Sequence, residues 1–303
     1  MEFVHRKNID TGRWDELIEN STAETIYAYS WYLDAVAENW SALMVGDYQF
    51  VMPLIWKKKY GIRFLYQPFY TQQLGVFSRE YVDPILITSM LSMLPGKFRF
   101  GNVHFNIQNL VGEEEPFTVD DKSNYVLDLN RPYDDLNRSF STNAKRNVKR
   151  AWDIGQEVEK DLSLEDLVAF KRANDVIKRT EDDYTWLVHL LETICEKSAG
   201  AVYASRIEGG LSAAAFFGFS RRRAIYLVSV SNETGKENRS MFKLVDSFIR
   251  DHSGTELVLD FEGSNIPSVA RFFGGFGARP EIYQGVSFNR MPMFLNKLRK
   301  HGG

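Results

Sequence analysis

The sequence predicts an α/β protein that contains two copies of one strand-strand-strand-helix-strand unit. Three observations lead to this prediction. The length of 303 residues suggests about two domains, and the 44% hydrophobic and 25% charged content is ordinary for a globular protein. Apolar strands alternate along the chain with helices that have one apolar face. The order of these elements in the second half repeats the order in the first half.

The first half contains two amphipathic segments, several strands rich in β-branched and aromatic residues, and a helix that begins at a proline. Proline suits a helix start because its φ is already helical and the first turn needs no N–H from it. The predicted helices are residues 11–20, 30–39 and 84–94, and the predicted strands are residues 42–45, 50–56, 62–66 and 102–107. The acidic stretch 111–123 is predicted to be a surface connector between the halves.

The second half is predicted to open with a strand and two helices and then to repeat the unit. The predicted elements are a strand at 125–129, helices at 133–152 and 164–178, strands at 201–207, 212–219 and 224–231, a polar loop at 232–240, a helix at 241–252, a strand at 257–264 and a helix at 267–273. Residues 51–107 and 213–262 match in the order of their elements, at low identity. We therefore predict domains at 1–123 and 124–303 and place the active site in the second.

Composition argues against several classes of function. The net charge of -3 is not that of a general nucleic-acid binder. One cysteine excludes an intrachain disulfide and a cysteine metal cluster, and the five histidines lack metal-ligand spacing, so we expect no metal. The N-terminal residues lack the apolar segment of a signal peptide, and no apolar run reaches membrane-spanning length. We expect a cytoplasmic protein without a membrane span; the sequence gives no indication of its oligomeric state.

The best candidate site lies in the stretch 224–264, which reads as strand, polar loop, helix and strand. A helix N-terminus presents unpaired backbone N–H groups and the positive end of the helix dipole. Lys236 and Arg239 come just before this helix and add positive charge. The loop therefore suits a phosphate group. The alternative is an ordinary strand-turn-helix with a solvated loop.

Four side chains of this stretch can carry acid-base chemistry. Asp260 and Glu262 alternate in the predicted strand, so both should point to the same face, where one carboxylate of the pair can act as a general base. A structural role for them, in capping the next helix or in an ion pair, is equally open. Tyr226 and Ser229 on the central strand can supply a proton or an oxyanion donor, although a buried tyrosine more often only satisfies its own hydroxyl.

A second group of candidates is cationic. Lys145 and Lys149 are four residues apart in the predicted helix 133–152, as are Arg146 and Arg150, so the four side chains share one side of that helix. An anionic ligand would offset their repulsion, but a solvated helix face also tolerates it. Arg179 follows the predicted helix 164–178 and is either a partner of the helix dipole or a ligand clamp.

Three segments together resemble the FemAB/FemX-like branch of the GNAT acyltransferases. They are Asn143-Ala-Lys-Arg-Asn-Val-Lys-Arg-Ala-Trp-Asp-Ile-Gly155, Asp260-Phe-Glu-Gly-Ser264 and Arg271-Phe-Phe-Gly-Gly-Phe-Gly-Ala278. The resemblance covers nearly the whole chain. It implies an α/β (α+β) fold of two tandem GNAT-like domains, each a mixed, mostly antiparallel sheet flanked by helices.

The resemblance also implies a function, an N-acyltransferase that moves an acyl group from a thioester donor, acyl-CoA, to an amine acceptor. The predicted catalytic residues are Glu262, Asp260 and Tyr226; the predicted donor-binding residues are Ser229, Lys236, Asn238, Arg239, Ser240 and Met241; and the predicted substrate or anion contacts are Lys145, Arg146, Lys149, Arg179 and Ser264. The expected partners are small molecules, the acyl donor and the amine, without a metal.

Two departures from the family pattern leave alternatives open. The loop 236–241 has neither glycine of the usual GNAT pyrophosphate pattern. The chain could therefore be a non-catalytic binding protein that kept the fold and lost the donor-binding loop. FemX-like ligases take an aminoacyl group from tRNA for cell-wall peptide synthesis, and in them a lysine usually occupies the position of Phe273. A phenyl ring cannot stabilise an oxyanion as an ammonium does, which argues against that chemistry here.

Overall fold

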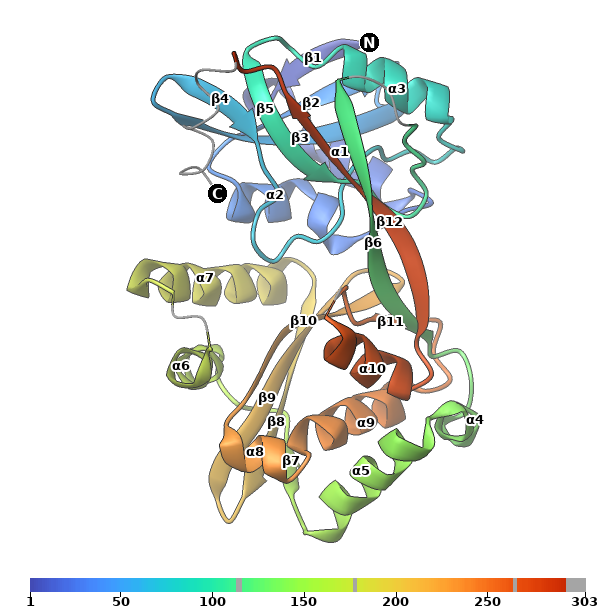
Figure 1. Cartoon of the computed structure of the whole chain (residues 1–303), viewed down its shortest axis with the longest axis vertical. Coiled ribbons are helices and arrows are strands. Elements are labelled where there is room, and N and C mark those ends of the chain that lie inside the picture. Colours follow the sequence, from blue (N-terminus) through green and yellow to red (C-terminus); the bar gives the residue numbers. More distant parts are fainter. Residues whose placement is uncertain (113–115, 177–178, 264–265, 293–303) are drawn as a thin grey trace. The chain divides into compact units, whose positions relative to one another are not determined.

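The computed structural model describes residues 1–112, 116–176, 179–263 and 266–292, which form two compact units (Figure 1). The first unit comprises Met1–Lys122 and the chain from Ile282 onward, and the second comprises Ser123–Glu281. The predicted division at residue 123 put the C-terminal chain with the second domain. In the structure, the chain from Ile282 onward belongs to the first unit, where strand β12 pairs with β5.

The first unit contains a sheet in the strand order β1-β2-β3-β4-β5-β12. Every neighbouring pair in it is antiparallel except β4 and β5, which are parallel. The strands are β1 (Glu2–His5), β2 (Trp40–Val45), β3 (Phe50–Lys59), β4 (Ile62–Leu65), β5 (Phe98–His104) and β12 (Arg279–Asn289), and the helices are η1 (Arg6–Asn8), α1 (Thr11–Glu19), η2 (Ile26–Ala28), α2 (Ser30–Val36) and α3 (Pro84–Ser92).

The second unit repeats this topology in the strand order β6-β11-β10-β9-β8-β7. Only β10 and β11 are parallel. The strands are β6 (Phe117–Asp128), β7 (Glu157–Glu159), β8 (Ala199–Ile207), β9 (Gly210–Phe219), β10 (Arg223–Ser231) and β11 (Val258–Asp260), and the helices are α4 (Tyr133–Ser139), α5 (Thr142–Asp153), α6 (Leu164–Asn174), α7 (Glu181–Lys197), α8 (Glu233–Glu237), α9 (Ser240–His252) and α10 (Pro267–Gly275). The predicted fold class and the internal repeat are both confirmed.

Two long strands are each divided between the units: β6 begins in the first unit and ends in the second, and β12 begins in the second and ends in the first. β12 pairs with β5 in the first unit, and β6 pairs with β11 in the second. The stretch 111–123 is therefore not a plain surface connector, because β6 starts at Phe117; the acidic residues 113–115 lie outside the described residues. Because the paired strands are far apart in the chain, no local sequence pattern indicates that they pair.

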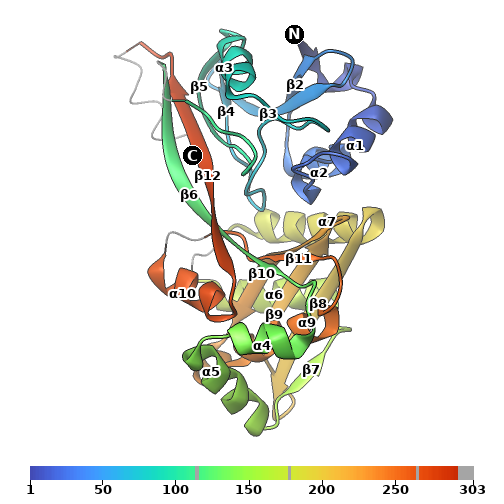
Figure 2. The same ribbon diagram turned by 90° about the vertical axis from the view of Figure 1, so that its right-hand side faces the viewer.

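Layers of helices cover both faces of the second sheet. α9 packs on one face against β8 and β9, while α6 and α7 pack on the other against β10 and β8 (Figures 1 and 2). α5 packs in turn on α9. The core between α9 and the sheet is rich in aromatic rings, such as the stacked pair Phe217 and Phe248 with ring centres 3.8 Å apart. This core fixes the positions of β10 and α9, which carry the candidate site.

Several predicted elements differ from the observed ones. The predicted helix 133–152 is two helices, because the chain is extended at Phe140 and Ser141 and the Ser141 hydroxyl accepts the Ala144 N–H to start α5. The predicted loop 232–240 contains the short helix α8, capped by the Asn232 side chain, which accepts the Gly235 N–H. α6 ends at Asn174, and the predicted end at Lys178 lies outside the described residues.

Candidate active site

A cavity opens in the second unit where β10 and β11 part. These parallel strands pair only from Arg223 to Ile225 on β10, and the cavity lies alongside the next residues of β10. Its volume is about 620 Å³. It is lined by Val176, Tyr226, Ser229, Val230, Ser231, Gly235, Lys236, Arg239, Met241, Phe242, Ser268, Val269, Phe272 and Phe273. The predicted site residues Tyr226, Ser229, Lys236, Arg239 and Met241 are thus brought together.

A β-bulge in β10 determines the direction of its two polar side chains, Tyr226 and Ser229. The register with β9 shifts between Tyr226 and Val228, so Leu227 is an extra residue in β10. In a regular strand, Tyr226 and Ser229 would point to opposite faces, because three positions separate them. The extra residue places both side chains on the cavity side, where Ser229 influences the pKa of Tyr226.

The Tyr226 hydroxyl is held in its protonated form. Burial raises the pKa of Tyr226 above its ordinary value, and the hydrogen bond with Ser229 opposes this shift only in part. The side chain is 7% exposed and packs near the rings of Phe217 and Phe261. A phenol in this state donates a hydrogen bond or a proton at neutral pH, so Tyr226 is suited to be an acid or an oxyanion donor rather than a base.

One end of the cavity is apolar. α10 contributes Phe272 and Phe273, and the first turn of α9 contributes Phe242, whose ring centre lies 4.8 Å from that of Phe272. Phe273 stacks on Phe261 with ring centres 4.9 Å apart and also faces Tyr226. Phe273 is the residue that occupies the position of the lysine in FemX-like ligases, and here it forms part of an apolar wall.

The other end of the cavity carries positive charge. Lys236 and Arg239 line it, and a smaller adjoining cavity of about 350 Å³ continues past Lys236 and Ser229–Ser231. This second cavity is lined from the end of α6 by Lys171, Asn174 and Asp175, and beyond them by Val176 and Arg179. Lys171 is paired with Asp175 at 2.7 Å. Arg179, predicted to be either a partner of the helix dipole or a ligand clamp, thus lines one cavity together with Lys236.

The start of α9 has an unusual backbone conformation. Arg239 precedes the helix with a φ of 62°, in the left-handed region that favours glycine, and no side chain caps the helix. The backbone therefore adopts a positive φ at a position that is not glycine. Gly235 is required for packing, because a Cβ there would lie 2.0 Å from the Ser212 carbonyl oxygen.

Two predicted donor-binding residues use their side chains elsewhere. Ser240 is fully buried, and its hydroxyl lies 3.0 Å from that of Ser212. Asn238 donates from its side chain to the Thr234 carbonyl oxygen, and its own carbonyl accepts from the Gln156 amide at 2.7 Å. Neither residue lines the cavity, so they shape the loop around it.

The predicted carboxylate pair is not formed as expected. β11 ends at Asp260, and Glu262 has a φ of 59°, so the strand alternation that was to align the two side chains does not apply. One Asp260 oxygen accepts from Arg223 at 2.5 Å and the other from the Glu262 N–H at 2.8 Å. Asp260 is 2% exposed and does not line the cavity. This geometry gives Asp260 a structural role, whereas Glu262 lies in the loop between β11 and α10.

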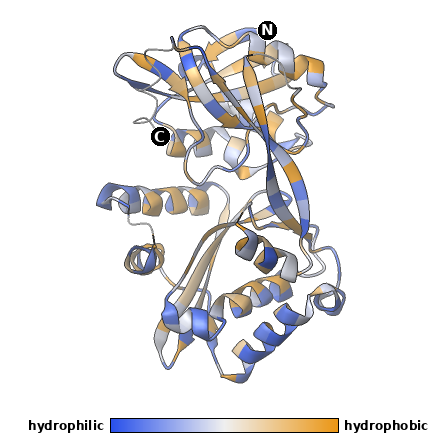
Figure 3. Ribbon diagram, viewed as in Figure 1, coloured by the Kyte–Doolittle hydropathy of each residue, from blue (hydrophilic) through white to orange (hydrophobic). Residues whose placement is uncertain are grey.

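The basic residues of α5 lie away from the cavity. Lys145, Arg146 and Lys149 are exposed, while Ala144 and Val148 are buried, and α5 is mostly blue in Figure 3. Lys145 donates to the Arg138 carbonyl oxygen and Arg146 to the Asn143 side chain. They form a charged surface and not part of the pocket. Ser264, the remaining predicted contact, lies outside the described residues.

Sequence reasoning missed the contribution of α10. Val269, Phe272 and Phe273 recur at helical spacing in a segment that was predicted to be a helix, so an apolar face was visible in the sequence. What the sequence did not show is that this face covers the gap between β10 and β11.

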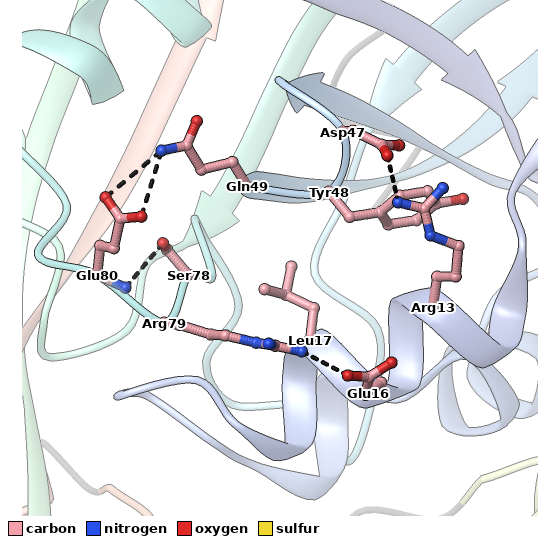
Figure 4. Close-up of a pocket in the computed structure, with 9 residues that line it drawn as sticks. All are labelled: Arg13, Glu16, Leu17, Asp47, Tyr48, Gln49, Ser78, Arg79 and Glu80. Carbon is pink, nitrogen blue, oxygen red and sulfur yellow. Dashed lines mark hydrogen bonds and ion pairs between the residues drawn. The ribbon is translucent and has the colours of Figure 1, made fainter.

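The first unit has a cavity of about 320 Å³ with a different character (Figure 4). Its charged groups pair with one another: Arg13 with Asp47 at 2.6 Å and Arg79 with Glu16 at 2.8 Å. Gln49 reaches Glu80 across the rim at 3.3 Å. These pairs are exposed, and nothing in the cavity shows acid-base chemistry. Among the residues that the structure describes, no group of three side chains could hold a metal ion.

No family model matches the sequence, and no curated protein matches it significantly. Solved structures are similar over nearly the whole chain. The crystal structure of FemX has a TM-score of 0.66 at 12% identity and covers 94% of this chain and 97% of its own. A tandem GNAT protein from the clavulanic acid biosynthesis pathway has 0.57 at 11% identity, covering 96% and 99%. The C-terminal domain of a putative lysylphosphatidylglycerol synthetase from Agrobacterium fabrum has 0.56 at 9%, covering 96% and 94%.

These similarities identify the fold. The chain has the fold of a tandem GNAT protein. Within that class it is similar to FemX along its full length, as the three sequence segments predict.

Proposed function

We propose that the second unit is an N-acyltransferase that moves an acyl group from an acyl-CoA thioester to an amine. The observation that carries this proposal is the composition of the cavity beside β10. It is lined by the aromatic rings of Phe242, Phe272 and Phe273, by the cations Lys236 and Arg239, and by the protonated Tyr226. An acyl thioester with an anionic tail has apolar, reactive and charged parts that suit these three kinds of lining residue.

In the proposed reaction the amine nitrogen attacks the thioester carbonyl carbon, the carbon–sulfur bond breaks, and an amide and a thiol are released. Tyr226, supported by Ser229, donates a hydrogen bond to the oxyanion or a proton to the leaving sulfur. The ammonium of the acceptor must lose a proton first. Glu262 remains the candidate base as a proposal, since it does not itself line the cavity but lies in the loop that leads to α10, whose Val269, Phe272 and Phe273 do.

The edge of β10 can position the donor. Pairing with β11 stops at Ile225, and the strand continues along the cavity to Ser231. An extended amide-containing arm can pair with a strand edge of this kind. The charged end of the donor would then reach Lys236, Arg239 and the start of α9.

Substitution of Tyr226 by phenylalanine tests the proposal. Thiol release from acetyl-CoA, measured with a panel of amines, should fall by about 10²- to 10³-fold in Tyr226→Phe, while acetyl-CoA affinity measured by calorimetry stays within a few-fold. Tyr203→Phe is the matched control, because Tyr203 is similarly buried on β8 of the same sheet but donates to Asp251 at 2.7 Å and lies outside the cavity. Absence of acetyl-CoA binding would refute acetyl-CoA as the donor, and full turnover in Tyr226→Phe would refute the role of Tyr226.

A second candidate is an aminoacyl-tRNA-dependent ligase, as in the FemX-like enzymes of the resemblance. The exposed basic face of α5 is the observation that favours it. A gel shift with charged tRNA at several salt concentrations tests it, because phosphate contacts weaken steeply with salt. A salt-sensitive complex without acetyl-CoA binding would favour tRNA as the donor.

A further inference from the structure

The hairpin formed by β3 and β4 (Figure 1) carries a group of positively charged residues. Lys57, Lys58 and Lys59 end β3, and Arg63 stands directly opposite Lys58 on β4. Like charges in opposite positions of an antiparallel pair destabilise it. Among the described residues, no acidic side chain forms an ion pair with Lys57, Lys58 or Arg63. The hairpin thus concentrates positive charge on a protein whose net charge is -3.

The tip of the same hairpin holds an exposed aromatic ring in an unfavourable conformation. Tyr60 and Gly61 form its two-residue turn with φ values of 51° and 80°. Such a turn favours asparagine, aspartate or glycine at its first position, so tyrosine there costs stability. The Tyr60 side chain is 76% exposed. Packing therefore does not explain the choice of this residue.

The cations lie on both faces of the hairpin around this tip. Lys57 lies over the Tyr66 ring at 4.9 Å on one face, and Arg63 lies near the Trp56 ring at 5.4 Å on the other. Lys59, next to the tip, is 5.9 Å from the Tyr60 ring centre. A flat anionic surface approached by the tip would meet cations from both faces at once. A nucleic-acid strand would instead need cations and stacking rings along a single face.

We propose that the β3–β4 hairpin docks end-on to the surface of a membrane rich in anionic lipids. Lysine and arginine are attracted to the negative surface of such a membrane. Tyrosine favours the headgroup region, where its ring is apolar and its hydroxyl remains hydrated. The contact is peripheral, since no helix in the described ranges is long and apolar enough to cross a membrane. This inference does not depend on the proposed transferase activity.

Sedimentation with lipid vesicles tests the proposal on the full chain. The parent should bind vesicles of phosphatidylglycerol and phosphatidylcholine, bind less as salt rises, and not bind vesicles of phosphatidylcholine alone. Lys57→Ala with Lys58→Ala should weaken binding by about 25-fold, or about fivefold for each charge removed. The control variant, Lys197→Ala with Lys7→Ala, lacks two exposed lysines outside the hairpin. Its affinity for the vesicles should be lower than that of the parent by only a small factor.

Tyr60→Asn separates membrane contact from folding. Asparagine suits the left-handed turn position, so the melting temperature should rise while vesicle binding falls. The proposal is overturned if the parent does not bind anionic vesicles, or if the hairpin variants bind them as the parent does. It is also overturned if substitution of the hairpin lysines weakens binding of a short single-stranded RNA and the parent does not bind vesicles.

Discussion

Tyr226 and Ser229 show how one extra residue in a strand creates a chemical site. The bulge at Leu227 brings their side chains to one face, and burial then keeps the phenol protonated. The residue types alone therefore predict neither the shared face of the two side chains nor the raised pKa of Tyr226. The same two residues in a regular strand would point to opposite sides of the sheet and would not share a cavity.

Glu262→Gln decides between the two roles left open for this residue. If Glu262 is the general base, the variant keeps the shape of the side chain but cannot accept the proton, so turnover should fall by about 10²- to 10⁴-fold with little change in donor affinity. The measurement is turnover, donor affinity and melting temperature on one preparation. Turnover close to that of the parent, together with a lower melting temperature, would assign Glu262 a structural role and leave Tyr226 or a bound water to handle the proton.

At the scale of elements, the α8–α9 junction supplies the positive end of the site. Arg239→Glu should weaken binding of acetyl-CoA, because it reverses the charge beside the N-terminus of α9. Calorimetric titration measures the change, which we expect to be about 10-fold or more.

Arg239→Gly is the matched variant for this position. It also removes the guanidinium, but glycine relieves the positive φ of 62°, so the free energy of unfolding should rise by up to about 1 kcal/mol while affinity still falls. Detectable acetyl-CoA binding that is the same in parent, Arg239→Glu and Arg239→Gly would place the anion elsewhere.

The basic face of α5 gives a second prediction at this scale. Lys145→Glu with Arg146→Glu should lower the affinity for an anionic donor or acceptor and leave the melting temperature within a degree or two, because both side chains are exposed. Activity measured across salt concentrations provides the test. A double reversal at the exposed residues Lys7 and Lys197 is the control. Equal activity of the α5 variant and the parent at every salt concentration would identify a solvated face without a ligand.

At the scale of the whole molecule, half-buried histidines couple stability to pH. Burial, aided by the charge of Lys122, lowers the pKa of His104 below its ordinary 6.5, and the Gln72 carbonyl and Asp120 oppose this shift. The unfolded chain therefore takes up protons that the native state resists, so this contribution to stability is present above about pH 6.5 and is lost as pH falls.

The pH dependence of melting measures this effect. Between pH 7.5 and 5.5 the parent should lose about 2–4 °C more than His104→Gln, which has no titrating ring. His252, whose pKa burial also lowers, should keep part of the slope in the variant. An identical slope in both proteins would show that His104 titrates alike in the native and unfolded states.

The sequence by itself determined the order of the elements and their repetition. Apolar spacing is a local property, so α9, β10 and α3 appear within a residue or two of their predicted bounds. The same local reasoning found Lys236, Arg239, Tyr226 and Ser229, because they lie on one strand-loop-helix segment. The break at Phe140 was missed, since Ser141 is an N-cap inside a stretch of continuous helical spacing.

Only the tertiary structure decided how these parts form a site. The bulge at Leu227 depends on the register with β9, and the gap that becomes the cavity depends on where β10 and β11 stop pairing. Asp260 has a structural role because one of its carboxylate oxygens accepts a hydrogen bond from Arg223, which is distant in sequence. The pairing of β6 with β11 and of β12 with β5 likewise joins segments that are far apart in the chain. Each of these features is a contact between distant segments, and such contacts form only when the sheet assembles and therefore leave no periodic pattern in the sequence.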